Sequence, residues 1–159
     1  MDYRRQIFYG IGSADECPLD FLPSVLGTDS PRDCYKKYSG STLLYKWTQD
    51  DVRNISWGYT LAWPVPEIYN SATADQWHRI SLLSRFNHGS SLHFRGEITQ
   101  LGACEQLRSQ NPGLPICIGT DYPASSGFKA LYNRIQNDQY TIVGNEMKCS
   151  TDIKNYYGP

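Results

Sequence analysis

Apolar and polar residues alternate along two stretches of the chain, as they do in strands that bury only one face. The clearer stretch spans residues 90–98, where Leu92 and Phe94 fall on one side and polar residues on the other. The second stretch spans 41–47 and carries a bulky residue at every other position. We expect a strand at each. Shorter apolar runs bounded by turn residues predict further strands at 3–9, 57–63, 114–118 and 140–143.

The spacing of apolar residues changes to three and four over residues 73–87, which predicts a helix. Trp77, Ile80 and Leu83 recur at that spacing, and a glycine follows the stretch. A strand over 79–82, preceded by a turn, is the alternative that the pattern leaves open. Caps and apolar spacing predict further helices at 31–38, 99–109 and 125–136.

These elements predict an α+β fold in a single domain, residues 1–159. We expect a twisted, mainly antiparallel sheet of four to six strands with two to four helices, stabilised by disulfides. A parallel segment fits the second half of the chain, because predicted strands and helices alternate there.

Composition narrows the classes of partner. The chain has 159 residues, of which 40% are hydrophobic and 13% aromatic, so it can bury a core and is not disordered. Its net charge of -1 gives no overall basic field that would hold a nucleic-acid backbone. No run of about 18 apolar residues is present, so we expect no membrane span.

The five cysteines are spread along the chain at positions 17, 34, 104, 117 and 149. No two form the close pairs that zinc sites use, which leaves disulfides or buried reduced thiols. We favour two disulfides and one remaining thiol, and hence a secreted protein that could also act inside a host cell. Connectivity stays open, and we expect Cys149 to pair with a cysteine of the N-terminal half.

Two groups of residues could carry catalysis. His93, Arg95 and Glu97 share one face of the predicted strand, where a base, a cation and a carboxylate could support acid–base chemistry. The alternative is the ordinary solvated face of a sheet. The second group is a Cys34 nucleophile with a histidine and an acid; its histidine would be His88 or His93, and its acid Asp121. A disulfide at Cys34 would exclude that role.

Aromatic residues gather on the two predicted central strands, at Tyr45, Trp47, Trp57, Tyr59 and Trp63. Such side chains form a recognition surface where they face solvent, and they fill the core where they do not. Twelve tyrosines in the chain favour some exposure, because a phenol hydroxyl seeks water or a polar partner.

The middle of the chain also carries four short motifs in a fixed order: Tyr45-Lys46-Trp47, Ala62-Trp63-Pro64, His78-Arg79-Ile80 and Ile98-Thr99-Gln100. Over residues 41–103 they resemble the strand motifs of the secreted fungal guanyl-specific ribonuclease and ribotoxin family. The resemblance requires residues 76–84 to form a strand, because the family arginine lies on one.

The same resemblance implies that cleavage has been lost. Enzymes of the family use a carboxylate base, a histidine acid and a phosphate-binding arginine, and the matching positions hold Ala62, Gln100 and Arg79. Neither alanine nor glutamine exchanges a proton near neutral pH. A protein of this kind would keep a ribonuclease-like scaffold and bind its target, as some secreted fungal effectors do.

We therefore expect a secreted, monomeric and non-catalytic effector that engages a host protein or RNA. Its expected binding surface comprises Tyr45, Trp47, Trp63, Arg79 and Arg95. The alternative is a small secreted toxin-like hydrolase or transferase that uses Cys34 or the face of His93. The sequence contains no cofactor or metal motif, so we expect neither.

Overall fold

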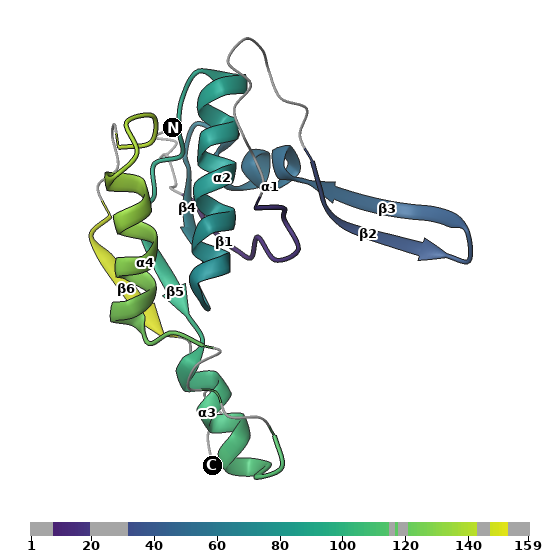
Figure 1. Ribbon diagram of the computed structural model, residues 1–159, viewed down its shortest axis with the longest axis vertical. Helices are drawn as coiled ribbons and strands as arrows, with labels where there is room; N and C mark the ends of the chain where they lie inside the picture. The colour runs from purple at the N-terminus through teal and green to yellow at the C-terminus, as the bar shows by residue number, and fades with distance from the viewer. Residues whose placement is uncertain (1–7, 20–31, 115–116, 118–120, 143–146, 153–159) are drawn as a thin grey trace, which may run out of the picture.

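The computed structural model of the chain describes residues 8–19, 32–114, 117, 121–142 and 147–152 (Figure 1). These residues form a mixed α and β structure with four helices and six strands. In chain order the elements are β1 (Phe8–Gly12), β2 (Asp33–Ser39), β3 (Thr42–Thr48), α1 (Gln49–Trp57), β4 (Ala62–Pro66), α2 (Ser71–His88), β5 (Gly96–Thr99), α3 (Leu101–Gln110), α4 (Ala124–Gln136) and β6 (Cys149–Asp152).

The strands pair in three small sheets, two of them parallel. β1 pairs with β4 and β5 with β6 in parallel, whereas β2 and β3 form an antiparallel hairpin. A parallel bridge between Glu67 and Ile98 connects the ends of β4 and β5. The expectation of an α+β class is confirmed, but that of a mainly antiparallel sheet is wrong. The reason is that long connections separate the paired strands: β2, β3 and α1 lie between β1 and β4, and α3 and α4 lie between β5 and β6. Such crossovers allow the second strand to run in the same direction as the first.

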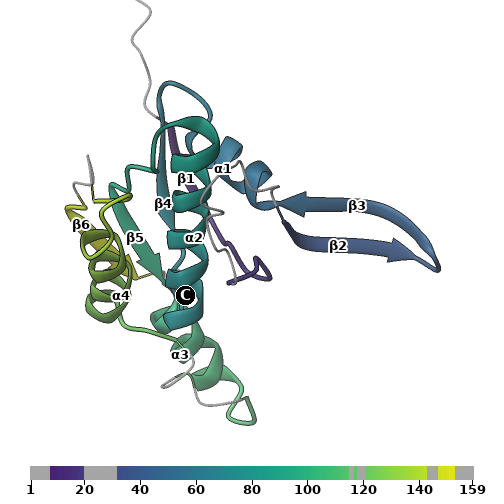
Figure 2. The ribbon, with the colours of Figure 1, turned by 45° about the horizontal axis from the view of Figure 1, so that its top comes forward.

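The core lies between the parallel strands and helices α2 and α4, which pack against each other. Both views show α2 beside β1 and β4, and α4 beside β5 and β6 (Figures 1 and 2). Trp77 and Phe94 are fully buried and meet edge to face, with 6.1 Å between ring centroids. The buried cluster comprises Ala14, Cys17, Ile68, Ala74, Trp77, Ile80, Leu92, Phe94, Leu131, Ile135 and Met147.

The predicted helix at 73–87 is confirmed by α2, and the alternative strand over 79–82 is wrong. α2 begins at Ser71, two residues before Thr73, because the N-cap Asn70 and Thr73 form a capping box in which each side chain accepts from the other's backbone N–H. It ends at Gly89, whose φ of 79° is a conformation that glycine adopts without strain. Because 76–84 is helical, the strand that the ribonuclease resemblance requires around Arg79 is not there.

The two later helices are also confirmed, with starts that differ by one or two residues. α4 begins at Ala124 without a side-chain cap, so neither Ser125 nor Ser126 is needed to start it. At α3 the free N–H of Gly102 donates to Asp152 of β6 at 2.8 Å. A carboxylate at that end is favourable, because it meets unpaired N–H groups and the positive end of the helix dipole.

Two predictions in the first half are wrong. Residues 33–39 form strand β2 and not a helix. The predicted strand at 57–63 is displaced, because Thr48 and Asp51 form a capping box that starts α1 and carries the helix to Trp57. The strand of this region, β4, begins only at Ala62 and includes Pro64 and Pro66.

The remaining strand predictions have mixed outcomes. The strand at 41–47 is confirmed by β3, whereas that at 90–98 is confirmed only over its last three residues, 96–98, which belong to β5. The strand at 140–143 is wrong for residues 140–142, which form a turn held by Asp138, and residue 143 lies outside the described residues. In the predicted strand at 114–118, the structure describes Leu114 and Cys117, and neither belongs to a strand. In the predicted strand at 3–9, it describes residues 8 and 9, which belong to β1. The other positions of both stretches lie outside the described residues.

Two disulfides and one free thiol are present, as the cysteine count predicts. Cys17 pairs with Cys34, and Cys104 pairs with Cys117. The expectation that Cys149 pairs with the N-terminal half is wrong, because its Sγ is free and lies 3.5 Å from the carbonyl oxygen of Arg95. Such disulfides are compatible with an extracellular protein. In the described part of the chain, no helix is both long and apolar enough to cross a membrane.

Candidate binding surface

The β2–β3 hairpin projects from the body of the molecule. Both views show it as a long two-stranded arm that starts beside α1 and ends in solvent (Figures 1 and 2). Its strands pair from Asp33 with Thr48 to Ser39 with Thr42. Gly40 in the connecting turn has a φ of 58°, which glycine accepts at little cost.

Large apolar side chains are exposed along this hairpin. Six of them have exposed fractions between 38% and 54%: Tyr35, Tyr38, Leu43, Leu44, Tyr45 and Trp47. Isolated aromatic or aliphatic residues on a surface need no explanation, but six on one narrow element form a patch of the kind that contacts partners. An exposed two-stranded hairpin is also only marginally stable by itself, so its root must be held.

The root of the hairpin is fixed in two ways. Cys34, the second residue of β2, is covalently joined to Cys17 of the body. Gln49, the first residue of α1, donates its N–H to the carbonyl of Arg32 at 2.9 Å, and its side-chain oxygen accepts from the N–H of Arg32. Gln49 is itself fully buried. The strands therefore leave the body at a defined place, which lowers the entropic cost of binding through them.

The hairpin is locally basic. The ammonium groups of Lys36 and Lys46 lie 2.7 and 3.1 Å from the carboxylate of Asp33. Both lower the pKa of Asp33 below its usual range, and Lys36 has the larger effect. Lys37 lies over the ring of Tyr45, with 5.7 Å from Nζ to the centroid. Three lysines against one acid give β2 and β3 a net charge of +2 in a chain whose total is -1. The hairpin therefore favours a partner with negative charge.

Each hairpin strand has only one neighbour among the described residues. The outer edges of β2 and β3 therefore present backbone N–H and C=O groups that no other described strand uses. Natural proteins usually shorten, cover or charge such edges, because an exposed edge recruits another strand. Here the edges span seven residues on each side and carry apolar side chains next to the lysines.

A second group of aromatic residues, the tryptophan cluster, lies on the body and comprises Trp57, Trp63, His93 and Arg95. The guanidinium of Arg95 stacks on Trp63 at 3.6 Å from the ring centroid. Trp57 contacts Trp63 at 5.3 Å and His93 at 4.9 Å between centroids. Burial lowers the pKa of His93, and the positive charge of Arg95 lowers it further, so the neutral imidazole is favoured near pH 7. These four side chains are half-buried and hold one another in place.

Glu97 does not share a solvated face with His93 and Arg95, so the expected trio is wrong. Its side chain is fully buried, and a Cβ on Gly127 of α4 would come within 2.9 Å of its Oε2. Neither carboxyl oxygen has a hydrogen-bond partner of ordinary geometry among the described residues. Burial raises the pKa of Glu97 to about 8, and repulsion from the carboxylate of Asp152 adds to this effect. Ser150 acts in the opposite direction. Glu97 is therefore a core residue whose surroundings favour the neutral carboxyl group.

The other catalytic candidates lie in separate places. Cys34 is bonded to Cys17, so no thiolate is available there for nucleophilic attack. His88 pairs with Asp50 of α1 at 2.6 Å, and Asp121 accepts a hydrogen bond from Gln100 at 3.1 Å. The described residues contain no group of three or more His, Cys, Asp or Glu side chains that could hold a metal ion.

The structure also divides the binding residues that the sequence singles out. Tyr45 and Trp47 lie on the hairpin, Trp63 and Arg95 form one stack on the body, and Arg79 lies on α2 close to Asp75 and His78. Sequence reasoning missed the residues that β2 contributes and the two leucines of β3. A glycine-containing turn at 39–42 between two aromatic stretches is a hairpin signal that could have found them.

Comparison of the chain with protein-family models, with curated proteins and with solved structures finds no match. The function must therefore be argued from the geometry of the chain itself.

Proposed function

We propose that this protein is a secreted, non-catalytic binding module that engages a partner protein through the β2–β3 hairpin. An extended, acidic and partly apolar segment of the partner adds as a strand to one edge of the hairpin. The observation that carries the proposal is the projecting hairpin itself, with strand edges that no other described strand uses, six exposed apolar side chains and a net charge of +2.

Strand addition explains features that ordinary surface packing does not. The added strand would form main-chain hydrogen bonds along the edge, which give affinity with little dependence on sequence. At the edge of β3, its alternate side chains would meet Tyr45 and Trp47, which give specificity. The lysines would pair with acidic residues and speed association. The disulfide at the root keeps the template in place before the partner arrives.

A protein partner fits these observations better than RNA. A nucleic acid uses base stacking and many phosphate contacts, but the hairpin has three lysines and one acid, too few for strong binding at physiological salt. The ring of Tyr45 is also already covered in part by Lys37 and lies 5.9 Å from Tyr35. The edge of a strand, by contrast, pairs with a polypeptide backbone, whose N–H and C=O groups complete the ladder of hydrogen bonds.

The proposal predicts the outcome of a selection from a display library of random twelve-residue peptides. We expect the protein to enrich peptides in which apolar residues alternate with Asp or Glu, because such peptides present one face to the aromatic residues and carry the opposite charge. Binding should weaken as salt rises. Synthetic copies of the enriched peptides, titrated against the protein by fluorescence anisotropy, measure the affinity.

The matched control replaces Lys36, Lys37 and Lys46 with serine, which removes the charge and keeps the apolar side chains. This variant should bind the acidic peptides more weakly and lose most of the salt dependence. Enriched peptides without acidic residues, or equal binding to the variant, would contradict the acidic-partner part of the proposal. If the protein captured single-stranded RNA or anionic vesicles but no peptide, the proposal of a protein partner would be rejected in favour of RNA or a membrane surface.

A second candidate is a small hydrolase or transferase activity at His93. The observation in its favour is a cleft of about 140 Å³, lined by Arg85, Ser91, His93 and Tyr140 among others. A neutral imidazole beside a cation and hydroxyl groups could act as a base. The cleft is small, however, and His93 packs against Trp57, so the hairpin remains the first proposal.

A further inference from the structure

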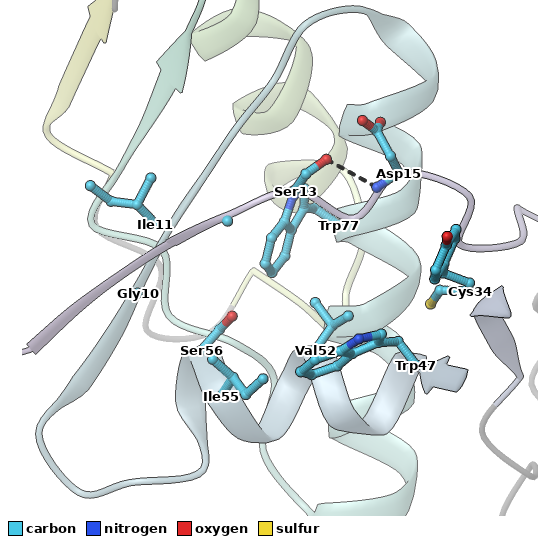
Figure 3. A pocket seen from close by; sticks show the side chains of 12 residues that line it. Gly10, Ile11, Ser13, Asp15, Cys34, Trp47, Val52, Ile55, Ser56 and Trp77 are labelled. Carbon is cyan, nitrogen blue, oxygen red and sulfur yellow. Dashed lines mark hydrogen bonds between the residues drawn. The ribbon is translucent and has the colours of Figure 1, made fainter. Parts of the chain in front are cut away.

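The cleft beside His93 and the larger cavity at the root of the hairpin differ in the chemistry of their walls. The cavity, about 340 Å³ in volume, lies beside Trp77 and is mostly apolar (Figure 3). It includes Tyr35 and Trp47, so it is continuous with the exposed surface of the hairpin. The cleft, about 140 Å³ in volume, is lined instead by side chains that can donate hydrogen bonds: Arg85, Ser90, Ser91, His93, Gln139 and Tyr140.

Several of these donors have no acceptor in the described part of the chain. Ser91 is only 4% exposed, yet its hydroxyl makes no hydrogen bond there. The hydroxyl of Tyr140 and the side-chain amide of Gln139 also make none. Native structures keep few polar groups buried without a partner, because each costs free energy. Since Ser91 lines the cleft and its Oγ is not sealed from it, a molecule in the cleft can supply the missing acceptor.

Arg85 gives the cleft a positive charge. Its Nη1 donates to the carbonyl oxygen of Gly89 at 2.6 Å, which holds the guanidinium at the end of α2 and offsets the negative end of the helix dipole. Arg85 forms no ion pair with a described acid, and no aspartate or glutamate lines the cleft. Asp138 is close to the cleft in sequence, but its carboxylate oxygens bond His78 and the N–H of Tyr140. A negative group in the cleft therefore meets a cation and no carboxylate in the lining.

The size of the cleft and the placement of its donors narrow the class of ligand. A volume of about 140 Å³ is below the range of sites for drug-sized molecules and suits a group of a few atoms. The donors come from three segments: the last turn of α2, residues 90–93 and residues 139–140. A tetrahedral phosphate group accepts hydrogen bonds from several directions, whereas the oxygens of a carboxylate lie in one plane. Arginine also binds phosphate through a fork of N–H groups, so the cleft fits a phosphate group best.

We propose that this cleft binds a phosphate group, either free inorganic phosphate or the terminal group of a phosphate monoester. Its oxygens accept hydrogen bonds from the guanidinium of Arg85 and from the hydroxyls of Ser91 and Tyr140. The site shares no residue with the hairpin and requires no catalysis at His93. Binding of the protein partner and binding of phosphate can therefore each fail without the other.

Inorganic phosphate, titrated into the ¹⁵N-labelled protein at constant pH and ionic strength, tests the site by NMR. We expect a saturable movement of the backbone amide signals of Ser91 and Tyr140, while those of the hairpin stay in place. Acetate at the same ionic strength should bind at least about tenfold more weakly, because it offers fewer acceptors and less charge. A parallel titration with O-phosphoserine distinguishes the free ion from a monoester, since the form that binds more tightly is the preferred ligand.

Two variants each remove one donor from the cleft. Arg85→Gln should weaken phosphate binding at least about tenfold, because hydrogen bonds to a charged group are lost together with the positive charge. Ser91→Ala should weaken it about fivefold, as the loss of one hydrogen bond implies. Arg85 is exposed, so its replacement leaves the core intact. The matched control is Arg108→Gln, because Arg108 is an exposed residue of α3 outside the cleft, and this variant should bind phosphate as the wild type does.

Three results would overturn the proposal. They are no saturable shift with either phosphate compound, equal binding of acetate, or equal affinities of Arg85→Gln and Arg108→Gln for phosphate. Signals that move only outside the cleft would also contradict it. If Ser91→Ala does not fold, the substitution of the exposed Arg85 still decides the question.

Discussion

The double substitution Tyr45→Ser with Trp47→Ser is expected to weaken binding of the selected peptides at least about 100-fold. Aromatic residues at the centre of an interface commonly contribute 2 kcal/mol or more each, and every 1.4 kcal/mol is a factor of ten in the dissociation constant. Both side chains are more than 40% exposed in the free protein, so their removal leaves the core intact. Anisotropy titration of the purified variant gives the change in affinity.

A matched control removes exposed apolar residues elsewhere. Tyr59 precedes β4 and Leu107 lies on α3, and their exposed fractions are 74% and 42%. The variant Tyr59→Ser with Leu107→Ser should bind the peptides as the wild type does. An equal loss in the two double variants would show that binding reports general surface hydrophobicity and not the hairpin.

Glu97→Gln is expected to stabilise the protein by roughly 4–5 kcal/mol at pH 8 or above and to change little at pH 4. The pKa of Glu97 rises from an ordinary 4.5 to about 8 on folding. Between pH 4.5 and 8 the carboxyl group is therefore protonated in the folded state and ionised in the unfolded state. The wild type therefore loses about 1.4 kcal/mol of unfolding free energy per pH unit over this range. Glutamine is neutral throughout and avoids that loss.

Urea denaturation of wild type and Glu97→Gln at pH 4, 6 and 8 measures the difference directly. The control is Glu105→Gln, because Glu105 is an exposed residue of α3. Its stability curve should run parallel to that of the wild type. Parallel curves for Glu97→Gln as well would mean that Glu97 is solvated or paired in the folded protein.

The helices are the part of the fold that the sequence predicts best. In α2 the apolar spacing, the Asn70–Thr73 capping box and Gly89 all agree, so local and tertiary preferences point to one structure. The start of α1 was missed although Thr48 and Asp51 cap it, because the aromatic residues that follow favour a strand.

The hairpin was half predicted, because the helix-start residues at 30–33 were given more weight than the turn signal at 39–42. Ser30, Pro31 and Asp33 are typical of a helix start, yet β2 begins at Asp33 because it pairs with β3. That pairing runs across the short turn at 40–41, and the disulfide of Cys34 ties the strand to the body. Intrinsic propensity is a weak guide where such contacts decide the structure.

The site was predicted in part. Tyr45 and Trp47 belong to the proposed surface and were singled out from the aromatic pattern of 41–47, where the predicted strand is confirmed. The burial of Glu97 could not be predicted, because alternation in 90–98 places it with His93 and Arg95, whereas β6 and α4 cover it in the fold. The cavity beside Trp77 joins residues from five separate segments, and sequence spacing has no signal for such a meeting.

Amide hydrogen exchange of the protein with and without a selected peptide tests most directly whether the hairpin is the working surface. Strand addition predicts new protection at outward-facing amides along one edge of residues 33–48 and little change elsewhere. Protection around His93 and Arg85, with the hairpin amides unchanged, would contradict the proposal and point to the small cleft instead.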